Sequence, residues 1–358
     1  MKIVKRVSVL ILFAVGLHLN AQVKFVNEFL SIGVGARAHG MSGSVVASTS
    51  DATAAYWNPA NLTSLNKPMQ LNAMHANWFG GIANYDWASL AFRMKGGKSF
   101  GSVSLIRMGI DNLPNTLNLV GPDNSINFDR ISTFSATDFA VLLSMAKKHS
   151  DRLDLGGSLK IIHRTIGSFG NSWGFGADFG IRYKLGNFVL AAQGRDITTT
   201  FNSWKFNLNE DQKDRFLSTG NDVPVSSTET TLPKLISGVA YKKVFKSFEL
   251  LAEGNVHFSR DGRAAGIIAS KNFIIEPTLG VELGVAEKVY LRGGLGNIQR
   301  IISLSSNNRV IDFQPNVGLG LVLGRLKIDY ALANVGNVSG VLASHIFSLA
   351  LDFKEKGE

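Results

Sequence analysis

The chain of 358 residues contains no cysteine, only 8 prolines, and a low share of charged residues, 18%. Without cysteine it can form no disulfide, carry no lipid-modified N-terminal cysteine and build no thiolate metal site. A soluble protein usually carries about 25% charged residues, so low charge combined with 45% hydrophobic residues argues against an ordinary soluble domain. Beyond the N-terminal segment the sequence has no run of about 18 apolar residues, which excludes membrane-spanning helices there.

Apolar residues are instead spread out by alternation. The segment FSLALDF at 347–353 places Phe347, Leu349 and Leu351 on one face of a strand and small or acidic residues on the other. Apolar side chains toward lipid and small or polar ones toward the lumen are typical of a transmembrane β-barrel. The 37 glycines suit such a wall, since glycine relieves crowding where another segment presses close.

The same pattern recurs along most of the chain and predicts fourteen strands, an even number as bacterial single-chain outer-membrane barrels require. We therefore expect an all-β fold, a 14-stranded antiparallel transmembrane β-barrel over 68–353, with an N-terminal plug of short helices in its lumen. The predicted strands are 69–79, 84–94, 99–107, 134–146, 153–164, 173–183, 187–197, 232–242, 247–258, 273–285, 288–295, 315–323, 326–334 and 345–353.

Charged residues within these strands fall on the polar face of the alternation. A charge facing lipid costs roughly 2–4 kcal/mol at the bilayer midplane, so these side chains are predicted to point into the lumen. Both signs occur, which indicates a lumen cross-linked by ion pairs rather than a conduction path of one sign. The set is Asp154, Lys160, Asp178, Arg182, Glu249, Glu253, Glu282, Arg292, Lys327 and Asp329.

The first 21 residues resemble a secretory signal peptide. Lys2, Lys5 and Arg6 form a basic start, residues 7–17 are apolar, and a small residue precedes Gln22. The alternative is a membrane anchor, but this apolar stretch is too short to cross about 30 Å of hydrocarbon as a helix. Export to the outer membrane of a Gram-negative cell is therefore expected, with the mature chain starting at or near Gln22.

Net charge says little about partners here. The formal charge is +10, and removing the three basic residues of the leader leaves +7 (10 − 3). Lysine and arginine are dispersed, without a dense basic run, so we expect no nucleic acid and favour contact with outer-membrane lipid and lipopolysaccharide headgroups. The last residues, 354–358, form a short charged tail.

Residues 22–67 differ from the rest and are predicted to form the plug. Small residues dominate, and Asp51 is placed to cap a short helix over 52–56. Pro59 prevents continuation of that helix and pushes Asn58 toward an extended backbone. Short helices rich in small residues suit a confined space.

Connections between the predicted strands differ in length. Short ones, such as 95–98, are expected to be periplasmic turns, and the long polar ones at 108–133, 198–231 and 296–314 extracellular loops. A helix is predicted at 209–217. The loop at 198–231 is rich in aromatic residues. Contact with a partner and simple packing over the barrel mouth are two alternative explanations for them. They are Phe201, Trp204, Phe206 and Phe216.

Two parts of the chain resemble the PorV/PorQ family of outer-membrane proteins. The first runs from LSIGVGARA at 30–38 through GMSG at 40–43 to DATAAYWNPA at 51–60. The second includes DRLDLGGSLK at 151–160 and GADFGI at 176–181. The Asn-Pro-Ala element at 58–60 is also similar to the plug of FadL-type long-chain fatty acid transporters.

The resemblance implies a FadL-like fourteen-stranded barrel with its N-terminal segment folded inside as a hatch. PorV-like members of the type IX secretion system help to move cargo with a C-terminal signal domain out of the translocon, and PorQ-like members help to anchor the attachment complex. The residues of the plug motif that carry the resemblance are Gly35, Arg37, Gly43, Asp51, Tyr56, Trp57, Asn58 and Pro59.

No catalytic, cofactor or metal site is expected, and the chain does not read as an enzyme. GVGARA at 33–38 lacks the third glycine of a dinucleotide fingerprint. The histidines are scattered without ligand spacing, and no Gly-x-Ser-x-Gly occurs. His163 and His257, on predicted strands, leave a barrel enzyme as a minor alternative.

Two functions remain from the sequence. The favoured one is protein handling in type IX secretion, with translocon subunits and cargo C-terminal signal domains as partners. The alternative is FadL-like uptake of hydrophobic small molecules, which predicts an apolar pocket between plug and wall near Trp57, Trp78 and Trp87. A secreted soluble β-protein is disfavoured, because one sandwich could not bury so many alternating faces.

Overall fold

The computed structural model describes residues 26–121, 125–260, 266–270, 273–302, 308–335 and 343–354. The predicted signal peptide at 1–21 lies outside the described residues, as do 22–25 of the predicted plug segment and 355–358 of the tail. Within the described ranges, no helix combines the length and hydropathy of a membrane span.

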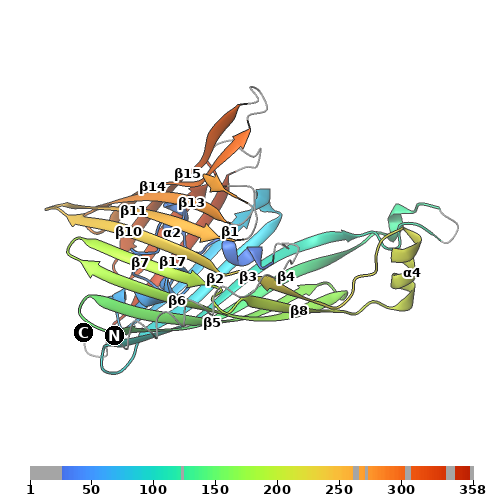
Figure 1. Cartoon of the computed structure of the whole chain (residues 1–358), viewed down its shortest axis with the longest axis horizontal. Helices are drawn as coiled ribbons and strands as arrows, with labels where there is room; N and C mark the ends of the chain where they lie inside the picture. The colour runs from blue at the N-terminus through green and yellow to red at the C-terminus, as the bar shows by residue number, and fades with distance from the viewer. Residues whose placement is uncertain are drawn as a thin grey trace.

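A closed barrel of fourteen antiparallel strands forms the body of the described chain (Figure 1). Consecutive barrel strands pair with one another, and β17 pairs with β1 to close the ring. This confirms the predicted fold class and strand number. The barrel strands are β1 (Met69–Trp78), β2 (Ala83–Arg93), β3 (Ser99–Asn115), β4 (Ser132–Lys148), β5 (Leu153–Ile166), β6 (Gly170–Leu185), β7 (Phe188–Arg195), β10 (Lys234–Val244), β11 (Phe248–Ser259), β13 (Ile274–Val285), β14 (Val289–Ile302), β15 (Arg309–Leu323), β16 (Leu326–Ala333) and β17 (Ser344–Phe353).

Each wall strand has an apolar outer face and an inner face whose side chains are buried in the lumen. On β13, Leu279 and Val281 are about half exposed on the outside, whereas Thr278 and Glu282 are buried on the inside. The period of two follows from the geometry of an extended chain. An apolar outer band with a polar interior is the architecture of an outer-membrane multi-pass β-barrel.

Several barrel strands run beyond their predicted ends. The predicted loops at 108–133 and 296–314 are partly strand, because β3, β4, β14 and β15 continue past the apolar band. Register shifts follow Ile110 in the β3–β4 pair and Gly296 in the β14–β15 pair. Such bulges interrupt the alternation, and extensions outside the lipid need no apolar face, so sequence periodicity could not detect them.

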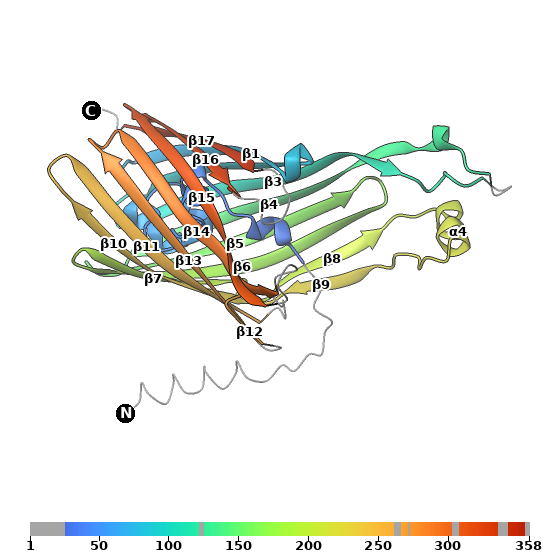
Figure 2. The ribbon, with the colours of Figure 1, turned by 90° about the horizontal axis from the view of Figure 1, so that it is seen from above.

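The predicted loop at 198–231 is also largely regular. It contains β8 (Thr200–Phe206), α4 (Glu210–Ser218) and β9 (Ser227–Thr231), which project from the barrel together with the ends of β3 and β4 (Figures 1 and 2). Asn209 caps α4 through a capping box with Gln212, one residue before the helix begins. The predicted helix is therefore present, whereas the two short strands were missed. Smaller elements in other connections are η3 (Phe79–Gly81), η4 (Phe128–Arg130) and β12 (Ile268–Ala269).

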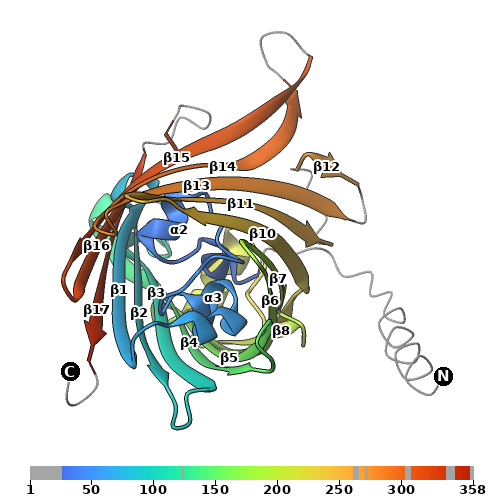
Figure 3. The same cartoon turned by 90° about the vertical axis from the view of Figure 1, so that its left-hand side faces the viewer.

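The described part of the N-terminal segment lies inside the ring of strands (Figure 3). It consists of η1 (Glu28–Ser31), α2 (Ala36–Gly40), α3 (Ala54–Trp57) and η2 (Pro59–Ser64). Helix α3 starts two residues later than predicted. The Asp51 carboxylate accepts a hydrogen bond from the Thr53 amide (2.9 Å), so it stabilises the turn before the helix rather than the helix N-terminus.

The plug presses directly on the backbone of the wall. η2 packs against β4, β5 and β6, and α2 packs against β15 and β16. A Cβ atom on Gly156 would lie 2.5 Å from the Ala60 nitrogen, and one on Gly180 would lie 2.0 Å from Asn58 Oδ1. The plug can therefore pack this closely against the wall only because residues 156 and 180 are glycine.

Candidate functional site

The predicted plug motif residues cluster where the plug turns back on itself. Gly35 and Gly43 have φ of 87° and 75°, a region that favours glycine. The Trp57 indole packs near Gly43 and donates from Nε1 to the Val34 carbonyl (2.8 Å). The motif therefore folds the plug into a compact unit with a tryptophan at its centre.

Tyr56 connects the plug to the wall. Its hydroxyl donates to the Leu30 carbonyl (2.5 Å) and accepts from Arg195 Nη1 (3.2 Å). The Arg195 guanidinium also lies 4.4 Å from the centre of the tyrosine ring, and Gln193 donates to the Tyr56 carbonyl (3.0 Å). The sequence did not single out Arg195, because nothing local marks the last residue of a strand as a plug contact.

Asn58 and Pro59 form the adjoining contact. Asn58 has an extended backbone, as its position before proline predicts, and Pro59 is the first residue of η2. The Asn58 side chain donates to the carbonyls of Val46 (3.1 Å) and Ile181 (3.2 Å), which lie in the plug and in β6. One amide group thus ties two plug segments to the wall.

A chain of four charges joins the opposite side of the plug to the wall. Arg37 of α2 donates to both carboxylate oxygens of Glu282, from Nε at 2.8 Å and from Nη2 at 2.9 Å. Arg292 also contacts Glu282 (2.5 Å) and reaches Asp329 (2.6 Å). Burial alone would lower the pKa of Arg37, but the attraction of Glu282 outweighs it and raises that pKa above its usual range.

The other predicted lumen charges also lie on the inner side of the wall, in separate groups. Lys160 pairs with Asp178 (2.8 Å) and with Asp196, a residue the sequence analysis missed because it lies in the irregular turn between β7 and β8. The remaining contacts are Asp154 with Arg182 (3.0 Å), Glu249 with Lys242 (2.8 Å), Glu253 with the Ala47 amide (2.7 Å) and Lys327 with Asp352 (3.5 Å).

The four predicted contact aromatics do not form one surface. Trp204 is buried on the inner side of β8, and the Phe206 ring stacks on its indole. The Trp204 Nε1 atom donates a hydrogen bond to the Glu229 carboxylate. Phe201 points the other way and lies beside Phe175 on the outer face. Phe216 lies apart from them on α4. Trp204 and Phe206 therefore pack together on the inner side, whereas Phe201 and Phe216 lie elsewhere.

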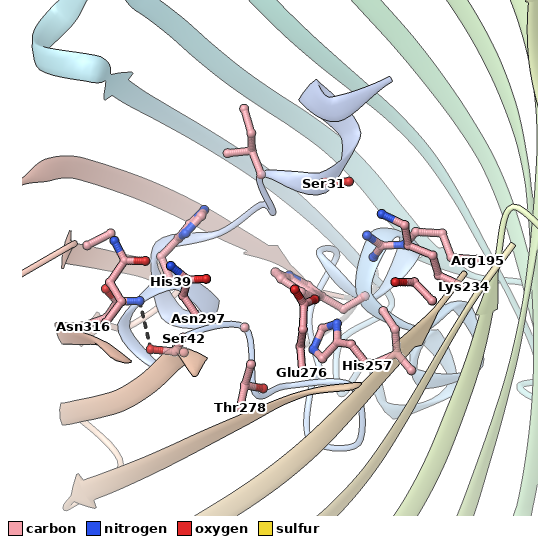
Figure 4. Close-up of a pocket in the computed structure, with 18 of the residues that line it drawn as sticks. Ser31, His39, Ser42, Arg195, Lys234, His257, Glu276, Thr278, Asn297 and Asn316 are labelled. Carbon is pink, nitrogen blue, oxygen red and sulfur yellow. Dashed lines mark hydrogen bonds between the residues drawn. The ribbon is translucent and has the colours of Figure 1, made fainter. Parts of the chain in front are cut away.

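A cavity of about 320 Å³ lies between the plug and the wall (Figure 4). Among its lining residues, Trp78 ends β1, Arg195 ends β7 and Lys234 begins β10, so the cavity lies toward the end of the barrel from which β8 and β9 project. We call it the vestibule. From the plug it is lined by Ser31, Ile32, His39, Ser42, Gly43 and Trp57. The wall contributes among others Trp78, Arg195, Lys234, His257, Glu276 and Asn316.

The vestibule differs from the apolar pocket that uptake was expected to need. Trp57 and Trp78 line it, but Trp87 is buried elsewhere (2% exposed), and most lining side chains are polar. Asn316 donates to the Ser42 hydroxyl (2.9 Å), a bond that crosses from wall to plug (Figure 4). The expectation of an apolar pocket beside all three tryptophans was wrong, because Trp87 packs against Tyr56 within the core.

His39 lines the vestibule from the plug side. Its Nε2 lies 3.2 Å from the Gly33 carbonyl, and its ring is 5.6 Å from that of Trp78. Burial lowers the pKa of His39 to about 4, so the imidazole is neutral near pH 7. No group of three metal-ligating side chains occurs in the described part of the chain.

Solved structures similar to this one are outer-membrane barrels. The toluene transporter TodX of Pseudomonas putida superposes with a TM-score of 0.57 at 11% identity, over 90% of this chain and 99% of that chain. The toluene transporter TbuX of Ralstonia pickettii gives 0.54 at 12% identity, over 90% and 98%. A Pseudomonas aeruginosa FadL homologue gives 0.51 at 12% identity, over 89% and 98%.

No protein-family model matches the sequence, and a search of curated proteins gives no match. The fold therefore defines the chain as a plugged transmembrane β-barrel of the outer-membrane type. Its fold is similar to that of a FadL homologue and of two toluene transporters, whereas the PorV/PorQ resemblance has no support from a family match. Two of these neighbours are described as toluene transporters and the third as a FadL homologue.

Proposed function

We propose that this barrel takes up small amphipathic or apolar molecules from the outer side of the membrane, with the vestibule as their first binding site. The observation that carries the proposal is the position of this cavity. It lies between plug and wall toward the end with the long connections, and the plug packs against the wall strands. The likeness of the fold to toluene transporters supports the same function.

The proposal is tested by uptake into proteoliposomes that contain the purified barrel. A panel of small aromatic and alkyl compounds should enter faster than into protein-free liposomes, and Trp78→Ala should slow entry because Trp78 lines the vestibule. Trp173→Ala is the matched control, since Trp173 is half exposed on the outer wall. Equal entry with and without the barrel, for every compound, would overturn the proposal.

A second candidate is PorV-like handling of secreted proteins, and one observation favours it. Arg215 of α4 donates to the carbonyls of Leu117 and Val120, both at 3.3 Å, so the two projecting segments are held together. Phe128 (72% exposed) and Leu217 (63% exposed) lie uncovered on these segments. A contiguous apolar patch on a surface is typical of a protein contact.

This second candidate predicts partners that can be captured. Tagged protein purified from mild-detergent outer membranes should bring down translocon subunits or exported proteins with a shared C-terminal domain. Replacing 207–226 with a short Gly-Ser linker should abolish the capture without reducing the amount of folded barrel. Recovery of the barrel alone from both preparations would exclude this function and leave uptake.

A further inference from the structure

The short turns at one end of the barrel are basic. They connect β2 to β3, β4 to β5, β6 to β7, β10 to β11, β13 to β14 and β15 to β16, at the end away from α4 (Figure 1). Together these turns carry a net charge of +4 (six lysines and arginines minus two acids). The described parts of the other connections between barrel strands carry −2 (five minus seven). Positive charge is therefore concentrated at the turn end, which is the periplasmic end of an outer-membrane barrel.

A groove of about 430 Å³ crosses the outer face of the wall close to two of these turns. Met145 of β4, which is 60% exposed, lies opposite Gly101 of β3 on one side and Gly157 of β5 on the other. A Cβ atom on Gly157 would have its nearest neighbour at 3.5 Å, so the groove is open there. The polar lining residues, among them Ser144 and Asp178, are buried on the inner face of the wall. The face that meets the membrane is therefore an apolar groove within the lipid-facing band.

Two lysines border the groove at its periplasmic edge. Lys147 follows Met145 by two residues, so it projects from the same face of β4 about 7 Å farther along the strand. Lys147 is opposite Ser99, the first residue of β3, and the Lys98 carbonyl accepts a hydrogen bond from the Lys148 amide (2.9 Å). Lys98 and Lys147 are both exposed, and neither forms an ion pair within the described residues. Their ammonium groups can therefore bind an anion beside the apolar groove.

The charges around these two lysines have the same sign. Residues 93–98 and 147–152 hold six lysines and arginines and one acid, Asp151, a net charge of +5 (6 − 1). Arg93 and Lys148 lie over the Phe100 ring, at 5.8 and 5.5 Å from its centre. Basic clusters at a membrane surface attract anionic lipid headgroups. A phosphate at this edge of the groove is therefore attracted from both turns.

We propose that the groove and the two lysines beside it bind one anionic phospholipid of the periplasmic leaflet. An acyl chain lies in the groove over Gly157, and the phosphate lies between Lys98 and Lys147. Hydrogen bonds from ammonium groups to a phosphate are stronger than neutral ones. A zwitterionic headgroup brings an ammonium group of its own, which the lysines repel. The site lies on the outside of the barrel and does not depend on the proposed uptake function.

Native mass spectrometry of the delipidated barrel, titrated in detergent with one lipid at a time, tests the headgroup preference. We expect phosphatidylglycerol to bind the unaltered barrel roughly tenfold more tightly than phosphatidylethanolamine. Lys98→Gln combined with Lys147→Gln should remove this preference. Lys246→Gln combined with Lys288→Gln is the matched control, because it removes two charges from other turns of the same end. The control should leave the binding of both lipids unchanged.

A second pair of variants tests the groove itself. Gly157→Leu fills the groove and should weaken phosphatidylglycerol binding severalfold. Gly293 of β14 also has no neighbour within 4 Å of a Cβ atom, and it lies away from the groove. Gly293→Leu should therefore leave the binding unchanged.

Equal binding of the two lipids to the unaltered barrel would overturn the proposal. This comparison needs no variant, so a folding defect would not leave the question open. An equal loss in the two double variants would show attraction by the whole turn end and would overturn a site at the groove. A glutamate-rich peptide that binds more tightly than phosphatidylglycerol, and equally tightly after Gly157→Leu, would assign the lysines to an acidic protein instead. Uptake into proteoliposomes is measured separately, so the proposed function stands or falls independently of this site.

Discussion

Arg37 of the plug and Glu282 of β13 form a two-pronged ion pair, with Nε–Oε2 at 2.8 Å and Nη2–Oε1 at 2.9 Å. The two residues are 245 positions apart in the sequence. Glu282 is also bound by Arg292, so the carboxylate lies between two guanidinium groups. The pair therefore attaches the plug to a wall that is itself cross-linked.

Removing this attachment should loosen the plug. Arg37→Met is expected to speed hydrogen exchange in residues 41–48 by roughly one to two orders of magnitude, because a buried pair loses one partner. Glu282 keeps Arg292, which limits the loss. Lys213→Met, in the exposed Lys213–Glu210 pair of α4, should leave exchange unchanged, since surface pairs contribute little. Equal exchange in both variants would mean that packing alone holds the plug.

The absence of cysteine makes a direct test of plug movement possible. Ser44 of the plug donates to Thr278 of β13 at 2.8 Å, so Ser44→Cys with Thr278→Cys should form a disulfide on mild oxidation. We expect the oxidised protein to keep at least half of its uptake into proteoliposomes, because the vestibule lies beside a docked plug. Uptake that is lost on oxidation and restored by a reductant would show that the plug has to leave its position.

Two neighbouring glycines should respond differently to one methyl group. Gly156→Ala places a Cβ 2.5 Å from plug backbone atoms and is expected to lower the yield of heat-modifiable, folded barrel severalfold. Gly157→Ala, one residue along, has its nearest contact at 3.5 Å and should be tolerated. Similar yields of the two variants would indicate that the plug can shift away from β5. Gel mobility before and after heating measures the folded fraction.

Acid should weaken the plug through His39. Its pKa is lowered to about 4 in the folded protein from an ordinary value of 6.5. The undocked state therefore binds a proton first, so plug stability is constant above pH 6.5, falls as the pH drops from 6.5 to 4, and then levels off. Over this pH range the free energy that favours the docked plug falls by roughly 3 kcal/mol.

Hydrogen exchange of residues 36–48, corrected for the intrinsic effect of pH, measures this change. His39→Phe should flatten the profile between pH 4 and 6.5. His149→Gln, in an exposed turn, should leave it as it is. A profile that His39→Phe does not alter would place the acid sensitivity in another group.

The barrel was predictable from the sequence because the pattern that indicates it, the alternation of apolar and polar residues, lies within each strand. Alternation at 278–285 and 347–353 reports which face of each strand meets lipid, and each segment can be judged without knowing its neighbours. Asn58 before Pro59 likewise fixes an extended backbone by sterics alone. The ends of β3 and β14 were missed because register shifts in the β3–β4 and β14–β15 pairs break the period of two.

The sequence could not predict which residues line the vestibule. Arg195, Lys234 and His257 lie on three strands, and nothing in their local sequence indicates that they line one cavity with Trp57. Solved structures of similar fold include two toluene transporters and a FadL homologue, and no family model matches the chain.

The sequence by itself showed that the chain has no cysteine and little charge. Its alternation of apolar and polar residues was enough to predict a fourteen-stranded membrane barrel. Hydrophobic periodicity acts within a few residues, so it is visible in any stretch of the chain. Only the tertiary structure decided which lumen charges pair, how the plug meets the wall glycines, and that a polar vestibule remains between them. Those contacts join residues far apart in the sequence, such as Arg37 and Glu282, and closing the barrel is what brings them together.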